Sequence, residues 1–436
     1  MLDPSTLRPL FEPRSVAIVG ASGDPNKIGG RPLAFLVRAG YGGALYPVNP
    51  GAAEVQGVRA YPSLAAIPGD VEHVIIALPA PAVTDALAQC AAKGVRAVQV
   101  FAAGFGEADE AGKAAQAGLV AAARAAGIRL LGPNSLGLFN VPLAFFGTFS
   151  TALDGAWPAA GGVAFATQSG AFGSYAYALA QARGLGFAKF VATGNEADVD
   201  VAECIAYLAQ DPATRVIVAT FEGCRDGRKL MAALELARSE RKPVIVMKAG
   251  ASEAGAAAAA THTGSLAGAD AVYDAVFKQC NAYRARTLGE LVDVAYLAAK
   301  GPLPAGRRLG AVTTSGGIGV LIADAAAERG LELPPLPAYG AARVKALLPH
   351  AGASNPLDTS AALIGDFALY ARAVEILLDE AGVDAVLGYL AHAGRNAAHF
   401  AKLEGPLFDL RRKHAEKLFA LCLLCTEDVR ARLEAG

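Results

Sequence analysis

The chain has 436 residues, enough for roughly two to four domains that each bury a core of their own. Its 39 basic and 40 acidic residues give a formal net charge of −1, and it has one tryptophan, so it lacks the basic, aromatic-rich surface that binds nucleic acid. No apolar run approaches the roughly 20 residues of a membrane span, and the N-terminus does not resemble a signal peptide. We expect a cytoplasmic protein that binds neither nucleic acid nor a membrane.

Six cysteines are scattered along the chain: Cys90, Cys204, Cys224, Cys280, Cys422 and Cys425. The last two form a C-x-x-C pair. Cys422 lies within the apolar run over 418–424 and Cys425 directly after it, whereas a redox-active pair is expected in an exposed turn. The spacing therefore predicts reduced thiols in the core and no metal site.

Three segments repeat one design, at 15–23, 162–170 and 309–317. Each has an apolar, β-branched run followed by a Ser-Gly turn and then a stretch compatible with a helix, which is typical of the first βα unit of a parallel α/β domain. Further strands are expected at 44–48, 73–78, 97–101, 128–132, 216–221, 242–248, 383–390 and 417–424. The pattern predicts an α/β protein of three consecutive Rossmann-like or flavodoxin-like parallel-sheet domains, at 1–142, 143–302 and 303–436.

The end of the third domain is expected to be truncated. A helix over 428–434 followed by glycine is the usual lead into another strand, and none follows in this sequence. We expect either a fragment of a longer chain or a domain that has lost its last strand.

The turn after the first strand, Gly20 to Gly30, is glycine-rich and carries Lys27, but it departs from G-x-G-x-x-G. Further turns follow the neighbouring strands at 46–50, 77–80, 101–107 and 131–137, on what should be one edge of the sheet. Together they indicate a nucleotide site, although each alone is also explained as a tight connection. Because no acidic residue ends the strand at 46–48 to bind an NAD ribose, an NAD-dependent oxidoreductase is the weaker reading.

His262 is framed by alanines at 256–260, by Gly264 and by the hydroxyls of Thr261, Thr263 and Ser265. Such a setting leaves room on the imidazole and supplies donors to an anion, so the ring could accept a phosphoryl group. A structural histidine in a small-residue turn is the alternative. The other histidines, His73, His350, His392, His399 and His414, lie outside comparable loops and are read as structural or surface residues.

With these motifs, the whole chain resembles the NDP-forming acyl-CoA synthetases, relatives of the succinyl-CoA synthetase α subunit. The resemblance implies that the first domain binds coenzyme A. The CoA-contacting positions it implies are Gly20, Ala21, Ser22, Lys27, Val48, Asn49, Pro50, Leu78, Pro79 and Asn134.

The second domain resembles the family's catalytic one, and the resemblance marks His262 as its phosphohistidine. It implies that Gln168, Ser169, Gly170 and Ala171 open a helix whose N-terminus holds the phosphate, and that Glu222 orients the imidazole. The third domain resembles the family's flavodoxin-like ligase domain through 314–317 and 354–358, motifs that we read mainly as turns.

One part of the family is absent from this sequence: there is no Walker A motif and no ATP-grasp domain. ATP or ADP with Mg²⁺ should therefore bind to a separate subunit or to a C-terminal domain of a longer polypeptide, in a homo- or hetero-oligomer. The implied reaction is acid + CoA + ATP to acyl-CoA + ADP + phosphate, through acyl phosphate and phosphohistidine. A non-catalytic CoA-sensing module, as in relatives fused to an acetyltransferase, is the main alternative, and neither the acyl group nor the direction can be read.

Overall fold

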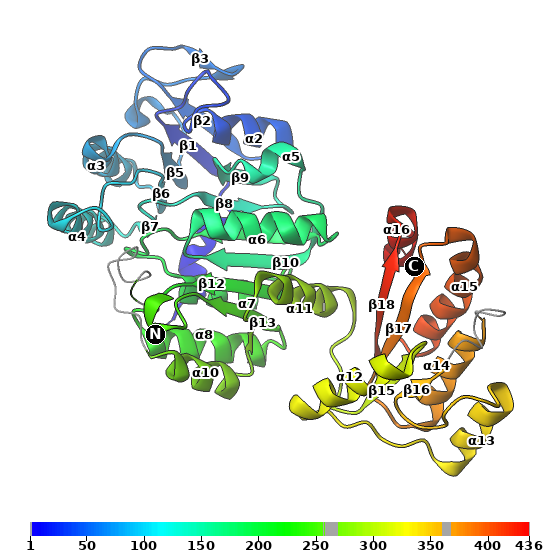
Figure 1. Ribbon diagram of the computed structural model, residues 1–436. Coiled ribbons are helices and arrows are strands. Elements are labelled where there is room, and N and C mark those ends of the chain that lie inside the picture. The colour runs from blue at the N-terminus through cyan, green and yellow to red at the C-terminus, as the bar shows by residue number, and fades with distance from the viewer. Residues whose placement is uncertain (1, 256, 258–268, 360–367, 436) are drawn as a thin grey trace. The chain divides into compact units, whose positions relative to one another are not determined.

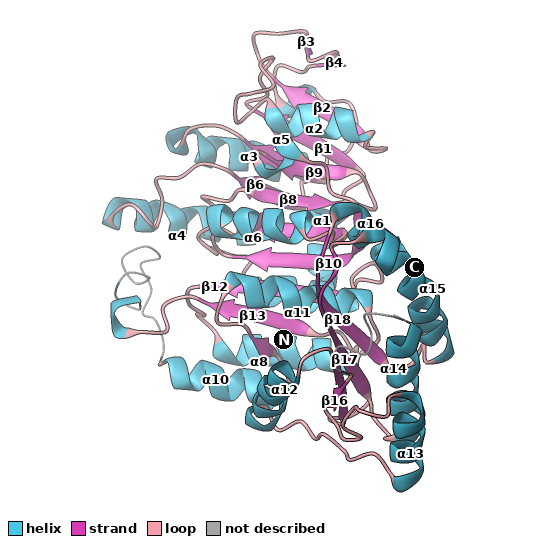
Figure 2. Ribbon diagram, turned by 45° about the vertical axis from the view of Figure 1, so that its right-hand side comes forward, coloured by secondary structure: helices cyan, strands magenta, loops and turns pink. Residues whose placement is uncertain are grey.

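The computed structural model describes residues 2–255, 257, 269–359 and 368–435, which form two compact units, 1–299 and 300–436. Each unit has a predominantly parallel sheet architecture with helices on its faces, so the α/β prediction is confirmed (Figures 1 and 2). Among the described residues, every helix is too short or too polar to cross a lipid bilayer.

The first sheet has the order β2-β1-β5-β6-β7 and is parallel throughout. Strands β1, β5 and β6 are buried along their whole length, as expected for parallel strands covered on both faces. The bounds are β1 Ser15–Val19, β2 Ala44–Val48, β5 His73–Ile76, β6 Ala97–Val100 and β7 Arg129–Leu131, with helices α1 Arg8–Phe11, α2 Arg31–Ala39, α3 Val83–Lys93 and α4 Glu110–Ala125 and the small hairpin β3 Glu54–Val55 and β4 Val58–Arg59.

The second sheet has the order β14-β13-β12-β10-β11-β8-β9 and belongs to the same unit. Its strands are β8 Gly137–Asn140, β9 Phe145–Thr148, β10 Ala160–Thr167, β11 Phe187–Ala192, β12 Val216–Phe221, β13 Val244–Lys248 and β14 Tyr283–Arg284. Its helices are α5 Ala152–Gly155, α6 Gly170–Ala182, α7 Val201–Gln210, α8 Gly227–Ser239, α10 Asp270–Gln279 and α11 Leu288–Lys300.

The β8–β9 hairpin was not expected from the sequence. Its strand β8 runs antiparallel to β11, so the hairpin joins an otherwise parallel sheet. The hairpin also binds the first sheet, because Gln99 on β6 donates from Nε2 to the Gly147 carbonyl at 2.5 Å. Asn140 donates from Nδ2 to the carbonyl of Phe11, at the end of α1, at 3.0 Å. Both contacts are buried, so the two sheets of the first unit are tied together through this hairpin.

The second unit contains a parallel sheet of order β16-β15-β17-β18. Its strands are β15 Leu309–Thr313, β16 Leu357–Asp358, β17 Ala385–Gly394 and β18 Leu418–Cys425, and its helices are α12 Gly316–Glu328, α13 Ala338–Leu347, α14 Ala368–Glu380, α15 Ala397–Lys413 and α16 Glu427–Ala435. The Asn355 amide binds main-chain atoms of Leu309, Ala311 and Pro334, so the 354–358 segment holds the sheet together.

The expectation of core thiols holds for three of the six cysteines, while Cys224 and Cys425 are half-buried and Cys422 contradicts it. Cys90, Cys204 and Cys280 are buried, but Cys422 is exposed because β18 lies at an edge of its sheet. The run over 418–424 is apolar although its strand lies at the edge of the sheet. The composition of the run alone does not reveal that position.

Candidate functional site

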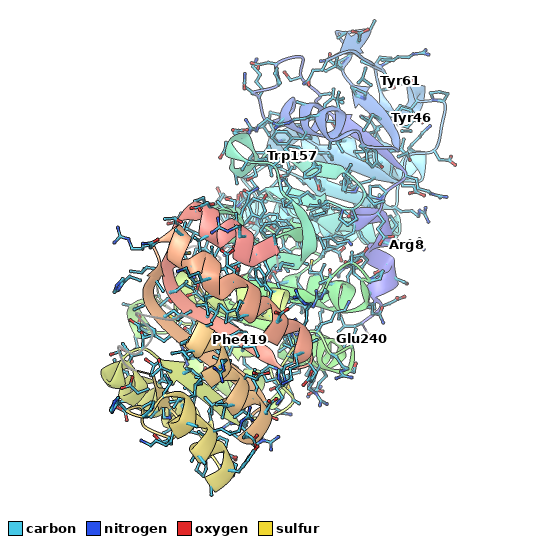
Figure 3. The ribbon with its side chains drawn as sticks, turned by 90° about the vertical axis from the view of Figure 1, so that its right-hand side faces the viewer. Arg8, Tyr46, Tyr61, Trp157, Glu240 and Phe419 are labelled. Atoms are coloured by element: carbon cyan, nitrogen blue, oxygen red, sulfur yellow. The ribbon has the colours of Figure 1, made fainter. Side chains whose placement is uncertain are left out.

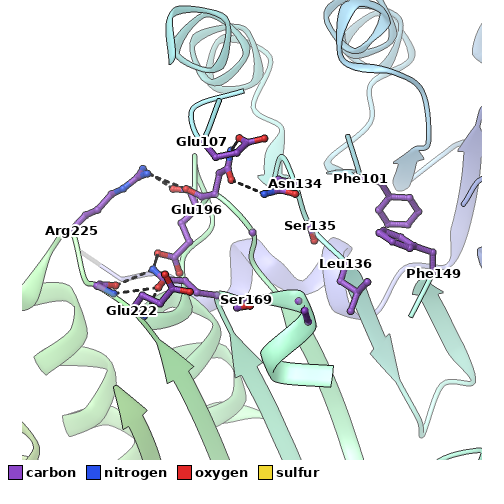
Figure 4. A pocket seen from close by; sticks show the side chains of 16 residues that line it. Phe101, Glu107, Asn134, Ser135, Leu136, Phe149, Ser169, Glu196, Glu222 and Arg225 are labelled. Carbon is purple, nitrogen blue, oxygen red and sulfur yellow. Dashed lines mark hydrogen bonds between the residues drawn. The ribbon is translucent and has the colours of Figure 1, made fainter. Parts of the chain in front are cut away.

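A cavity of about 490 Å³ opens in the first unit where strands of both sheets end. Figure 4 shows a polar side with Glu107, Glu196, Glu222 and Arg225, and an aromatic side where the rings of Phe101 and Phe149 meet edge to face. The remaining lining residues are Asn134, Ser135, Leu136, Gln168, Ser169, Gly170, Ala171, Gly194, Asn195 and Gly223. The four residues predicted to hold phosphate and Glu222, predicted to orient the imidazole, thus line one cavity: Gln168, Ser169, Gly170, Ala171 and Glu222.

The N-terminus of α6 faces this cavity. Ser169 is the N-cap residue, and its side chain accepts a hydrogen bond from the Phe172 amide at 3.3 Å. The amides of Gly170 and Ala171 lie in the first turn, where an α-helix provides no acceptor for them. These groups, together with the positive end of the helix dipole, create a place suited to an anion such as phosphate.

Gln168 lies at the predicted position, but its side chain is engaged with protein rather than facing a ligand. Its Nε2 donates to Glu196 Oε2 at 2.5 Å and to the Gly223 carbonyl at 2.9 Å. Its Oε1 accepts from the amides of Glu222 and Gly223 at 2.7 and 3.3 Å, and its own amide bonds the Thr220 carbonyl. Both amide hydrogens are therefore committed, and in this structure Gln168 holds the turn that carries Glu222.

The sequence reasoning missed Glu196. It follows β11, has a positive φ of 55°, and is only 6% exposed. Burial raises the pKa of its carboxyl group to about 7, even though hydrogen bonds from Gln168 and the Val201 amide favour the ionised form. A polar residue in a loop carries no sequence signal for such burial, because the burial comes from the surrounding strands.

A network at the cavity mouth connects the two sheets. Arg225 donates from its guanidinium to the carbonyls of Asn195 and Glu196, both at 3.0 Å. Asn195 in turn makes a short hydrogen bond with Glu107 and accepts one from Asn134 at 3.3 Å. Asn134, expected to contact CoA, is exposed and lines the cavity. It thus lies where the edge of the first sheet meets the cavity.

The turn after β1 is closed by close backbone contacts. Gly20 has a φ of +87°, and a Cβ at Gly29 would lie 2.2 Å from the Gly20 carbonyl oxygen. Asn49 donates to the Ala21 carbonyl at 2.9 Å, and Gln56, which the sequence reasoning did not single out, donates to the Ser22 and Gly30 carbonyls at 2.8 and 3.0 Å.

The other expected CoA positions lie along the same edge. The Gly20 amide bonds the Val48 carbonyl at the end of β2, and Leu78 lies against Gly20 just beyond β5. Lys27, within the turn after β1, is exposed, and so are Pro50 and Pro79, which follow β2 and β5. Tyr46 and Tyr61 meet edge to face at the same outer part of the unit (Figure 3), with Arg59 over the Tyr61 ring.

His262, the expected phosphoryl acceptor, lies outside the described residues. The described part of the site therefore supplies the anion-binding helix end and the Glu222 turn, and gives no distance to the imidazole.

Comparisons with known proteins agree with this architecture. Residues 14–140 match the CoA binding domain family, and residues 160–298 match the succinyl-CoA ligase like flavodoxin domain family. The chain is 40% identical over 380 residues to the ADP-forming acetate–CoA ligase II subunit alpha of Pyrococcus furiosus, covering 86% of this chain and 80% of that protein.

Two longer comparisons extend the likeness. An ADP-forming acetate–CoA ligase I of Archaeoglobus fulgidus is 39% identical over 87% of this chain, which spans 54% of that protein. The solved structure of Ca. Korarchaeum cryptofilum dinucleotide forming acetyl-coenzyme A synthetase 1, in complex with phosphate and ADP, superposes with a TM-score of 0.89 at 31% identity, covering 99% of this chain and 91% of that one. The chain belongs to the family of ADP-forming acyl-CoA ligases, as a counterpart of their α subunits.

Proposed function

We propose that this chain binds CoA on its first sheet and carries a phosphoryl group on His262. The observation that supports this most directly is the single cavity that brings Asn134 of the first sheet's edge together with the α6 N-terminus and Glu222. CoA bound along the Gly20–Gly30 turn would extend its thiol toward this cavity, where an acyl group and phosphate can be held within reacting distance.

The chemistry divides into balanced steps. Phosphate oxygen attacks the thioester carbonyl and the CoA thiolate leaves, giving an acyl phosphate. A nitrogen of His262 then takes the phosphoryl group and releases the carboxylate, and ADP finally takes it to form ATP. Ser169, Gly170 and Ala171 would stabilise phosphoryl charge from the helix end, and the Glu222 carboxylate would fix the imidazole tautomer. Run in reverse, the same steps make acyl-CoA from acid, CoA and ATP.

The nucleotide step requires a partner. We propose that ADP, ATP and Mg²⁺ bind to an ATP-grasp subunit or domain, and that a small carboxylic acid is the acyl source. The P. furiosus relative is named as an alpha subunit, and the Korarchaeum structure holds phosphate and ADP. The six free thiols agree with a cytoplasmic location, which we also propose.

A half-reaction tests the proposal without the partner. The full chain is incubated with acetyl-CoA and radiolabelled phosphate, and the acid-labile, base-stable label typical of phosphohistidine is counted. We expect label on the wild-type protein and none on His262→Ala, with CoA released in equal amount.

Absence of label on wild-type protein that binds CoA would contradict the proposal and leave a CoA-sensing module. Equal labelling of His262→Ala would move the acceptor elsewhere. Calorimetric titration with CoA, with NAD as the control ligand, checks the binding step separately.

A further inference from the structure

Glu196 is a buried acid with no assigned task in the steps above. Its two carboxyl oxygens have different partners: Oε1 accepts from the Val201 amide at 2.8 Å and from the Thr193 hydroxyl at 3.1 Å, while Oε2 accepts from Gln168 Nε2 at 2.5 Å. The Val201 amide and Gln168 Nε2 can only donate, so each carboxyl oxygen faces at least one donor, whereas the Thr193 hydroxyl also bonds the Thr167 carbonyl.

Gln168 relays this arrangement to the catalytic turn. Because its Nε2 faces the Glu196 carboxylate, its Oε1 faces the other way and accepts from the amides of Glu222 and Gly223. If the Gln168 side-chain amide were flipped, its NH₂ group would face the N–H donors of Glu222 and Gly223. The orientation of one amide group therefore couples Glu196 to the backbone of Glu222.

We propose that Glu196 is a positioning residue: it holds the Gln168 amide in one orientation, which fixes the Glu222 turn beside the N-terminus of α6. The inference rests on the function proposed above, since it assigns Glu196 to the support of the same phosphoryl site. Glu196 acts through Gln168 and Glu222, and makes no contact with the reacting atoms in this scheme.

The surroundings of Glu196 decide how it responds to pH. Asp200, at the start of α7, opposes its ionisation, and the thiols of Cys204 on α7 and Cys224 after β12 also interact with it electrostatically. The Arg225 guanidinium binds its main-chain carbonyl. With a pKa of about 7, the carboxylate that holds Gln168 forms as the pH rises through neutrality.

An exchange of carboxylate for amide tests the donor–acceptor chain. In Glu196→Gln one amide group must face a donor, either the Val201 amide or, after a flip of Gln168, the amides of Glu222 and Gly223. The reverse exchange at Gln168 cannot serve as a rescue, because a carboxylate oxygen in place of Nε2 would face the Gly223 carbonyl oxygen.

The measurement is the rate of phosphohistidine formation by the full chain from acetyl-CoA and radiolabelled phosphate. Glu196→Gln is expected to lower this rate about ten- to a hundredfold at pH 8, with the half-saturating concentration of acetyl-CoA unchanged within about twofold. Glu203→Gln is the matched control, because Glu203 lies nearby on α7 but bonds Arg129 and does not line the cavity.

A second readout separates positioning from general damage to the fold. The ratio of the wild-type rate to the Glu196→Gln rate cancels the titration of phosphate itself, and it should rise between pH 6 and pH 8. A ratio that is flat with pH, or a Glu196→Gln rate within twofold of wild type, would overturn the inference. An unlabelled wild-type chain would instead refute the proposed function.

Discussion

Gly29 illustrates how single residues shape the turn after β1. A Cβ there would lie 2.2 Å from a backbone oxygen, whereas a Cβ at Gly118 on α4 meets nothing within 4 Å. A backbone oxygen cannot rotate away as a flexible side chain can, so Gly29→Ala must shift the turn itself.

We expect Gly29→Ala to raise the Kd for CoA about tenfold or more, equivalent to about 1.4 kcal/mol, while Gly118→Ala leaves it unchanged. Isothermal titration with CoA measures both. Unchanged affinity in Gly29→Ala would show that this turn does not bind CoA.

His73 makes the stability of the first unit sensitive to acid. The side chain on β5 is fully buried against Phe145, and burial lowers its pKa to about 4. The unfolded chain binds a proton near pH 6.5 and the folded chain does not, so stability is intact above pH 6.5 and is lost progressively as the pH falls toward 4.

Between pH 7.5 and pH 5, the wild-type protein should lose about 2 kcal/mol more free energy of unfolding than His73→Leu. Urea unfolding followed by the fluorescence of Trp157, the single tryptophan, reports on this unit (Figure 3). His350→Gln, at an exposed histidine, is the control. An equal pH dependence of the free energy of unfolding in wild type and His73→Leu would contradict the role given to His73.

At the scale of elements, local patterns predicted most of the long parallel strands but missed the parallel strand β11, the short parallel strands β14 and β16 and the antiparallel hairpin β8–β9. The segment expected at 216–221 is a strand over the same residues, because a continuous β-branched run marks a buried parallel strand. Strands β8 and β9 have four residues each and are bordered by glycine and proline, which indicate turns locally. Their strand structure arises from pairing with β11, about 50 residues further along the chain.

The site divides in the same way. Ser169, Gly170 and Ala171 could be placed from sequence because a Ser-Gly turn after a buried strand starts a helix, and the structure confirms that helix start. Glu196 could not, since its burial and its bond to Gln168 depend on three strand ends meeting. The role of the Gln168 side chain also depends on its neighbours, which no local pattern specifies.

At the scale of the whole molecule, the two units have separate hydrophobic cores. The core around Tyr370 and Phe400 is built only from residues of the second unit, and the three other clusters only from residues of the first. Each unit therefore buries apolar surface without drawing on the other.

A chain ending at Ala299 is expected to fold and to bind CoA with a Kd within about threefold of the full chain, since the turn after β1 and both sheets of the first unit are complete in it. Near-ultraviolet circular dichroism and titration with CoA test this. A fragment that lacks cooperative unfolding would show that the first unit depends on residues beyond 299.

The β8–β9 hairpin bears on how such enzymes diversify. It follows the CoA-binding sheet in the chain, completes the next sheet, and is hydrogen-bonded to both. Recombination between relatives at residue 140 would separate β8 from β9 and pair each with a foreign neighbour. An exchange that keeps these contacts would have to move 1–299 as a whole, so we expect new acid preferences to arise by point substitution within this unit more readily than by exchange of its first sheet.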